Sequence, residues 1–128
     1  DAGAPVTLVG EGRRRHSFVA EKDVAAFLLA ALRDPRAANA TIVVGGPEAL
    51  SWRDVVAIYE EVTGRAIDVR TVAPGQPLPG LPDVVAQLAA GLDTYDSPIP
   101  MDDACATYGV ELTSARECAA RARVAAGG

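Results

Sequence analysis

The hydrophobic period of the chain changes once between Arg15 and Leu32, and this change constrains the fold more than any other feature of the sequence. Arg15–Val19 is strand-like, whereas from Asp23 to Leu32 apolar side chains recur three and four residues apart. The second pattern is typical of one face of an amphipathic helix. A strand followed closely by a helix indicates a chain of the α/β class.

A β-hairpin is predicted before this helix. Pro5–Val9 and Arg15–Val19 are strand-like runs, and Gly10-Glu11-Gly12 lies between them. Glycines supply the positive φ that a tight return of the chain requires. We therefore expect the two runs to pair across this turn.

The next segments predict a helix and a buried strand. Asp23 is a good N-cap, because its carboxylate can accept hydrogen bonds from the amides of the first turn, and Asp34-Pro35 should end the helix. Thr41–Val44 is a short apolar run with β-branched side chains. Such a run suits a strand that is covered on both faces.

A second helix is better specified by its ends. Ser51 and Asp54 have the spacing of a capping box, and Gly64 should stop the helix. Trp52 and Tyr59 fall on its apolar face and are expected to lie mostly in the core. Ile67–Val72 then alternates as a half-buried strand does, and a proline-rich loop follows it.

Three more helices are expected, beginning near Pro82, Asp102 and Ser114. The order is thus a hairpin and few strands with four to five helices. This is an α/β arrangement with too few strands to complete a doubly wound sheet. Since 128 residues, 49% of them hydrophobic, can bury one core, residues 1–128 are predicted to form a single domain.

Composition excludes several functions. A formal net charge of -5 and a pI near 4.8 argue against a nucleic-acid partner, and Arg13–Arg15 is expected to be a solvated arm. No apolar stretch approaches the roughly 20 residues that cross a bilayer. Cys105 and Cys118 lack the spacing of a metal or redox pair. We expect a cytoplasmic protein without a membrane partner.

Two stretches carry a family resemblance. His16–Phe27, and then Gly46–Trp52 within the wording GGPEALSW, resemble the atypical short-chain dehydrogenase/reductases, in particular the NmrA-like NAD(P)H-binding group. The resemblance implies an incomplete Rossmann-type C-terminal part that acts as a substrate-binding subdomain. The hairpin and the later strand would belong to that subdomain, and Thr41–Val44 would extend the edge of the Rossmann sheet. A partner or self-association would complete the fold.

The residues that would bind and use a dinucleotide are missing from this sequence. It has no Gly-x-Gly-x-x-Gly turn between a strand and a helix, which a pyrophosphate requires. The Tyr-x-x-x-Lys pair used by many members of the superfamily is also absent, since Lys22 is the only lysine. The chain is therefore expected to bind no cofactor alone, with NADP or NAD entering only with a nucleotide-binding part. A single histidine, His16, makes a metal site improbable.

The resemblance also implies a substrate pocket. His16 and Ser17 would border it, and Tyr95 and Met101 would line an apolar cavity. In one hypothesis the chain is the substrate-binding portion of an NAD(P)-dependent oxidoreductase or isomerase, either excised from a longer polypeptide or completed by a Rossmann-containing partner chain. In the other it is a stand-alone homo-oligomer that binds a small molecule without cofactor or acts as a non-redox isomerase or cyclase, with His16, Asp96 and Glu21 as acid/base groups. Whether the chain alone is an enzyme stays open between them.

Overall fold

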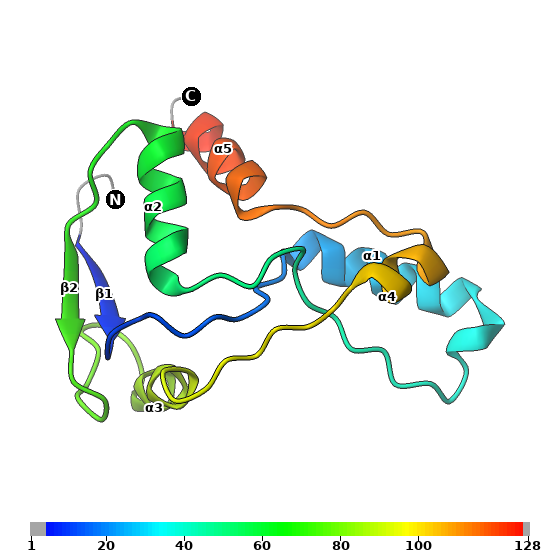
Figure 1. Ribbon diagram of the computed structural model, residues 1–128, viewed down its shortest axis with the longest axis horizontal. Helices are drawn as coiled ribbons and strands as arrows, with labels where there is room; N and C mark the ends of the chain where they lie inside the picture. The colour runs from blue at the N-terminus through cyan, green and yellow to red at the C-terminus, as the bar shows by residue number, and fades with distance from the viewer. Residues whose placement is uncertain (1–4, 127–128) are drawn as a thin grey trace. The chain divides into compact units, whose positions relative to one another are not determined.

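The computed structural model describes residues 5–126 and divides the chain into two compact units (Figure 1). Unit 1 takes the described residues up to Arg15 together with Leu50–Asp96. Unit 2 takes His16–Ala49 and the residues from Ser97 onward. The single domain predicted from the sequence stays a prediction.

Unit 1 contains a two-stranded parallel sheet. β1 (Val6–Val9) pairs with β2 (Val69–Val72), and the register places Val6 opposite Val69 and Val9 opposite Val72. Figure 1 shows the two strands side by side. The strand that ends at Val72 is thus confirmed, but its partner Val9 lies 63 residues earlier in the chain, since 72 − 9 = 63.

The predicted hairpin is wrong. Gly10 and Gly12 do adopt positive φ, 67° and 62°. The turn, however, is held by the Asp93 carboxylate, which accepts hydrogen bonds from the amides of Glu11 at 3.3 Å and Gly12 at 3.1 Å. Arg15–Val19 forms no strand among the described residues, and only an isolated bridge joins His16 to Ser97.

Two helices complete unit 1. They are α2 (Trp52–Thr63) and α3 (Asp83–Leu92), and α3 contacts β1. The buried core of this unit consists of Val9, Leu78 and Ala86. The proline-rich loop therefore has a structural task, because it carries Leu78 into the core between β2 and α3.

The ends of α2 confirm the capping prediction. The Ser51 hydroxyl accepts from the Asp54 amide at 3.1 Å, and the Asp54 carboxylate accepts from the Ser51 amide at 2.9 Å. Gly64 ends the helix with φ 67°. The expectation of a core position for Trp52 is wrong in this structure, since its side chain lies at the first helical residue and is 39% exposed.

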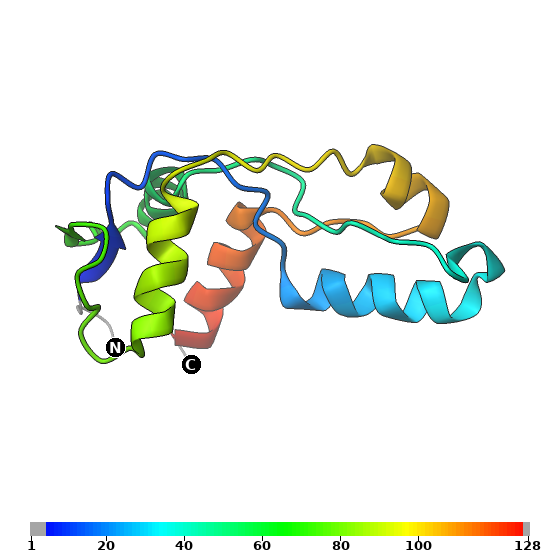
Figure 2. The same cartoon turned by 90° about the horizontal axis from the view of Figure 1, so that it is seen from below.

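Unit 2 is helical. Its elements are α1 (Glu21–Arg33), a short 3-10 helix η1 (Pro35–Ala37), α4 (Asp102–Tyr108) and α5 (Ala115–Ala126). Figure 2 shows the chain turning back at η1 after α1. Phe27, Met101 and Val110 form the buried core of the unit, and the Phe27 ring meets the Tyr108 ring edge-on with centroids 6.3 Å apart.

Asp23 corrects another prediction. The N-cap of α1 is Ala20, and Asp23 lies inside the first turn, where only 2% of it is exposed. Its carboxylate accepts hydrogen bonds from the Thr113 amide at 2.6 Å and from the Thr113 hydroxyl at 2.8 Å. Asp23 therefore ties the start of α1 to the segment before α5 rather than capping its own helix.

Thr41–Val44 is extended but forms no strand within the described part of the chain. Ile42 and Val44 pack against the Phe27 cluster, whereas Val43 is 59% exposed. The side chains of this segment thus alternate between packed and exposed, as in a strand, although no strand pairs with it among the described residues. The α/β class is confirmed, with one parallel pair in place of the predicted hairpin.

None of the helices within residues 5–126 has the length and apolar character needed to cross a membrane.

Candidate functional site

Unit 2 brings three extended segments of the chain together, residues 16–19, 45–46 and 97–101. The ring nitrogen Nδ1 of His16 is joined to Ser97 Oγ by a hydrogen bond of 2.6 Å, whose donor depends on the imidazole tautomer. The backbone follows the same pairing, because the Ser17 amide donates to the Ser97 carbonyl at 3.3 Å. We call this arrangement the three-segment crossing.

Ser17 lies at the centre of the crossing. Its hydroxyl accepts a hydrogen bond from the Ile99 amide at 2.9 Å, and its carbonyl accepts from the Gly46 amide at 3.0 Å. The neighbouring Gly45 amide donates to the thioether sulfur of Met101 at 3.1 Å. One serine thus links both of the other segments.

The two glycines are needed because the segments approach so closely. A Cβ at Gly46 would lie 1.8 Å from the Phe18 carbonyl oxygen, and one at Gly45 would lie 2.9 Å from the Ile99 Cβ. Real Cβ atoms essentially never come within 3.0 Å of another heavy atom of this kind. The Gly-Gly pair is therefore a packing requirement of the crossing.

His16 is the polar centre of the crossing and is buried, with 5% of its surface exposed. Its ring lies 5.8 Å from the Phe18 ring, centroid to centroid. A short hydrogen bond fixes the orientation of the Ser97 hydroxyl, which is only half-buried. The imidazole and the hydroxyl together can pass a proton to or from a polar ligand that reaches Ser97.

The structure brings some of the predicted site residues together and leaves others apart. His16, Ser17 and Met101 meet in the three-segment crossing, where Met101 is buried in the core rather than open to a cavity. Glu21 is exposed in the first turn of α1. Among the described residues, its side chain makes no hydrogen bond or ion pair to the three-segment crossing.

Tyr95 and Asp96 belong to unit 1. Tyr95 is 51% exposed. The Asp96 carboxylate accepts from the Arg15 amide at 2.9 Å and forms an exposed ion pair with Arg14 at 3.7 Å. Asp96 therefore already holds the arginine segment, which is a structural task.

The sequence did not reveal Ser97 or Thr113 as partners of His16 and Asp23. Ser97 lies 81 residues from His16, and Thr113 lies 90 residues from Asp23. Local patterns carry no information on such pairs. The family resemblance alone placed His16 and Ser17 beside a candidate pocket, and it named no partner for either residue.

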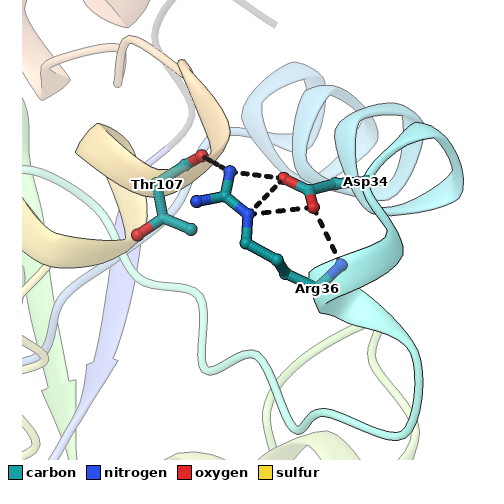
Figure 3. A network of polar contacts seen from close by, with 3 residues as sticks. All are labelled: Asp34, Arg36 and Thr107. Atoms are coloured by element: carbon teal, nitrogen blue, oxygen red, sulfur yellow. Dashed lines mark hydrogen bonds and ion pairs between the residues drawn. The ribbon is translucent and has the colours of Figure 1, made fainter.

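A second polar cluster lies at the far end of α1 (Figure 3). The Arg36 guanidinium donates to the Asp34 carboxylate, with Nη2 2.6 Å from Oδ2, and to the Thr107 carbonyl at 2.9 Å. The Arg36 guanidinium lowers the pKa of the Asp34 carboxyl, and Asp34 raises the pKa of Arg36. Arg36 therefore satisfies a carbonyl near the end of α4 and joins η1 to that helix.

A shallow depression of about 520 Å³ lies beside this cluster and includes Ala30, Arg33 and Tyr108 in its lining. On the other side of Arg33, an apolar depression of about 750 Å³ includes Leu28, Leu32 and Ala37. Both are open hollows on the surface of unit 2. Neither is lined by a residue predicted to bind substrate.

The amides of two glycine-rich turns within residues 5–126 are bonded to other groups of the protein. The pyrophosphate of such a cofactor needs free amides in a glycine-rich turn. The Glu11 and Gly12 amides are bonded to Asp93, the Gly45 amide to Met101 and the Gly46 amide to Ser17. Every glycine-rich turn considered from the sequence thus has its amides occupied by the protein itself.

Residues 5–126 contain no group of three or more His, Cys, Asp or Glu side chains that could hold a metal ion. The half-buried Cys105 has a raised thiol pKa, caused mainly by burial and also by the nearby carboxylates of Asp102 and Asp23. A thiol with a raised pKa is a poor nucleophile at neutral pH. Neither metal chemistry nor cysteine chemistry is favoured by the described residues.

No family model matches the chain. In sequence it is similar to plant reductases. It is 44% identical over 63 residues to the bifunctional pinoresinol-lariciresinol reductase of Linum album, covering 48% of this chain and 19% of that protein. It is 33% identical over 64 residues to an isoflavone reductase homolog of Nicotiana glauca, covering 49% and 21%. The chain spans about a fifth of the length of these curated relatives.

Solved structures show a likeness in fold over nearly the whole chain. A crystal structure of isoflavone reductase matches with a TM-score of 0.66 and 20% identity, covering 94% of this chain and 44% of that one. A variant of the UDP-glucuronic acid 4-epimerase of Bacillus cereus, in complex with a UDP-sugar and NAD, matches with a TM-score of 0.66 and 17% identity, covering 97% and 36%. The chain has the fold of one part of these larger enzymes.

Proposed function

We propose that this chain is the substrate-binding portion of an NAD(P)-dependent oxidoreductase or isomerase of the short-chain dehydrogenase/reductase type, and that it is not redox-competent alone. The observation that carries the proposal is the fold match, which covers 94% of this chain but only 44% of isoflavone reductase. The sequence similarity to pinoresinol-lariciresinol reductase over half of the chain supports the same class. The occupied amides of the glycine turns support the absence of a dinucleotide site in this part.

The three-segment crossing is the proposed ligand site. His16 and Ser17 lie in it, and Ser97 joins them as the half-buried hydroxyl to which His16 is bonded. We assign Ser97 the direct polar contact with the ligand, while the buried His16 acts through it as a positioning residue and an acid/base group. Ser17 holds the backbone segments in place. Tyr95 and Met101 stay proposals for apolar contacts, and Glu21 and Asp96 stay proposals for acid/base groups.

The relatives in sequence include pinoresinol-lariciresinol reductases. Pinoresinol is therefore a suitable probe, and NADPH is the cofactor probe. Native mass spectrometry of the 13.2 kDa chain, with each probe added separately, should show a 1:1 adduct with pinoresinol and none with NADPH. NMR titration of the amides should then place the pinoresinol shifts at residues 16–17 and 97.

Two variants test whether Ser97, rather than His16, contacts the ligand. His16→Gln keeps a side chain that can bond Ser97 and should retain binding of pinoresinol, whereas Ser97→Ala should weaken it by about tenfold through loss of one polar contact. Glu111→Ala, an exposed change elsewhere in unit 2, is the matched control. An NADPH adduct of the isolated chain would contradict the assignment of this part. A discrete homo-oligomer that binds neither probe would favour the stand-alone, cofactor-free hypothesis.

A further inference from the structure

A hollow on the surface of unit 2 lies where α1 and α4 both end. Its volume is about 520 Å³, and the residues that line it are Ala30, Arg33, Asp34, Pro35, Thr107 and Tyr108. We call it the η1 hollow, because Pro35 begins the 3-10 helix η1. Its lining residues all differ from those of the three-segment crossing, so the hollow is separate from the proposed ligand site.

Contacts within unit 2 hold the walls of the η1 hollow in place. The Tyr108 ring meets the Phe27 ring edge-on with centroids 6.3 Å apart, and α1 contacts α4. Arg36 holds two more lining residues, because its guanidinium donates to the Asp34 carboxylate and to the Thr107 carbonyl (Figure 3). Walls that are already fixed reduce the entropy that a ligand loses by ordering them.

The charges at the η1 hollow add up to one positive charge. The Asp34 carboxylate accepts hydrogen bonds from Arg36 Nε at 3.0 Å and Nη2 at 2.6 Å, so these two charges neutralise each other. Arg33 is exposed in the last turn of α1, and its guanidinium makes no hydrogen bond or ion pair with another residue among 5–126. Such a guanidinium can bind an anion through two parallel N–H donors.

Tyr108 and two apolar residues complete the lining. The Tyr108 hydroxyl has no hydrogen-bond partner within the described part of the chain. Asp34 is the main cause of the raised pKa of Arg36 and Tyr108 contributes to it, which places the phenol near the Arg36 guanidinium. Ala30 and Pro35 add apolar surface. The η1 hollow therefore offers one cation, one hydroxyl donor and an apolar wall.

We propose that the η1 hollow binds a small aromatic monocarboxylate, whose carboxylate pairs with Arg33 and accepts a hydrogen bond from the Tyr108 hydroxyl. The ring of the ligand packs on Ala30 and Pro35. One negative charge matches the single positive charge of the hollow, whereas a phosphate monoester carries nearly two at neutral pH and is repelled more strongly by Asp34. Because both helices end here, their carbonyl ends disfavour an anion, and we expect a Kd of about 1 mM.

The test is an NMR titration of the full chain with sodium benzoate, against sodium chloride at the same ionic strength. Saturating shifts are expected at the amides of residues 33–34, 36 and 107–109. Benzyl alcohol, which has the ring without the charge, should bind at least about tenfold more weakly, because it lacks the charge-assisted hydrogen bonds to Arg33. Phenyl phosphate should also bind more weakly than benzoate.

Matched variants identify the groups that bind benzoate. Arg33→Gln should raise the Kd by about tenfold, and Tyr108→Phe by about threefold through loss of one neutral donor. Arg33→Lys keeps the charge at the end of α1 but not the planar fork, so an intermediate loss is expected. Arg65→Gln is the control, because it removes the same charge from an exposed arginine of unit 1. Circular dichroism establishes that each variant is folded.

Several results would overturn the proposal. They are shifts that grow linearly without saturation, equal affinity for benzoate and benzyl alcohol, and tighter binding of phenyl phosphate than of benzoate. A folded Arg33→Lys or Arg33→Gln variant that binds benzoate as the wild type does would overturn it as well. The proposal is independent of the proposed function, since pinoresinol is expected to shift residues 16–17 and 97 and benzoate is not.

Discussion

Replacing Asp23 by alanine should destabilise unit 2 more than any other single loss of a charge. The carboxylate is 2% exposed and accepts both the amide and the hydroxyl of Thr113, at 2.6 Å and 2.8 Å. Alanine would leave two buried donors without an acceptor, and each such group costs about 1–3 kcal/mol. We therefore expect the free energy of unfolding to fall by about 3 kcal/mol.

The assay is native-state hydrogen exchange of the Thr113 amide, because that proton makes one of the lost bonds. A loss of about 3 kcal/mol corresponds to exchange that is faster by about a hundredfold. Thr113→Val, which removes only the hydroxyl donor, should cost about 1–2 kcal/mol. Glu111→Ala, an exposed carboxylate two residues away, should change stability by less than about 0.5 kcal/mol. A cost below about 1 kcal/mol for Asp23→Ala would refute the reasoning that this pair ties α1 to the segment before α5.

Three further outcomes can be checked. Gly46→Ala should lower the midpoint of thermal unfolding or prevent folding, because the added Cβ would lie 1.8 Å from a carbonyl oxygen. Gly91→Ala in α3 should instead raise the free energy of unfolding by about 0.5–1 kcal/mol, because no atom lies within 4 Å of the added Cβ and alanine favours the helix. Ser51→Ala should cost about 1 kcal/mol at neutral pH in urea denaturation. Hydrogen bonds from Ser51 lower the pKa of Asp54 below its ordinary 3.8. The stability that these bonds contribute is therefore present above about pH 4 and is lost as the pH falls through the lowered pKa. If wild type and Ser51→Ala differed in stability as much in acid as at neutral pH, this reasoning would be contradicted. Cys105, whose thiol pKa is raised above 9.0 by burial, should react with iodoacetamide more slowly than free cysteine near pH 8, and equal rates would count against its burial.

Local signals predicted the local structure well. The capping box of Ser51 and Asp54 and the stop at Gly64 are both present, because each depends on nearby residues. Ser114 and Glu117 form a second capping box where the last helix was predicted to begin. For the glycine turns, the local sequence predicted the backbone conformation but not the residue that holds the turn. The positive φ at Gly10 was predicted, but not that Asp93, far along the chain, would hold the turn.

Pairing over long distances could not be read from the sequence. β1 pairs with β2 in parallel, and Thr7 lies opposite Arg70, 63 residues later in the chain, with no sequence motif that predicts the pairing. In the candidate site, the prediction that His16 and Ser17 border a substrate pocket stays a prediction. Their hydrogen-bond partners Ser97 and Ile99 lie 81 and 82 residues further along the chain. The burial of Met101 likewise results from its packing with Phe27, which is distant in the sequence, and not from the residues next to it in the chain.

The interleaved order of the two units has a consequence for the growing chain on the ribosome. Unit 1 has all of its segments once Asp96 is made, whereas unit 2 waits for residues from Ser97 onward although its first segment starts at His16. During that interval Asp23 has no Thr113 to bond and Phe27 has no Met101 or Val110 to pack against. A stall in translation between Asp96 and Thr113 would thus expose an apolar helix whose acidic anchor is still unpartnered, and this is the period in which the nascent chain most needs a chaperone.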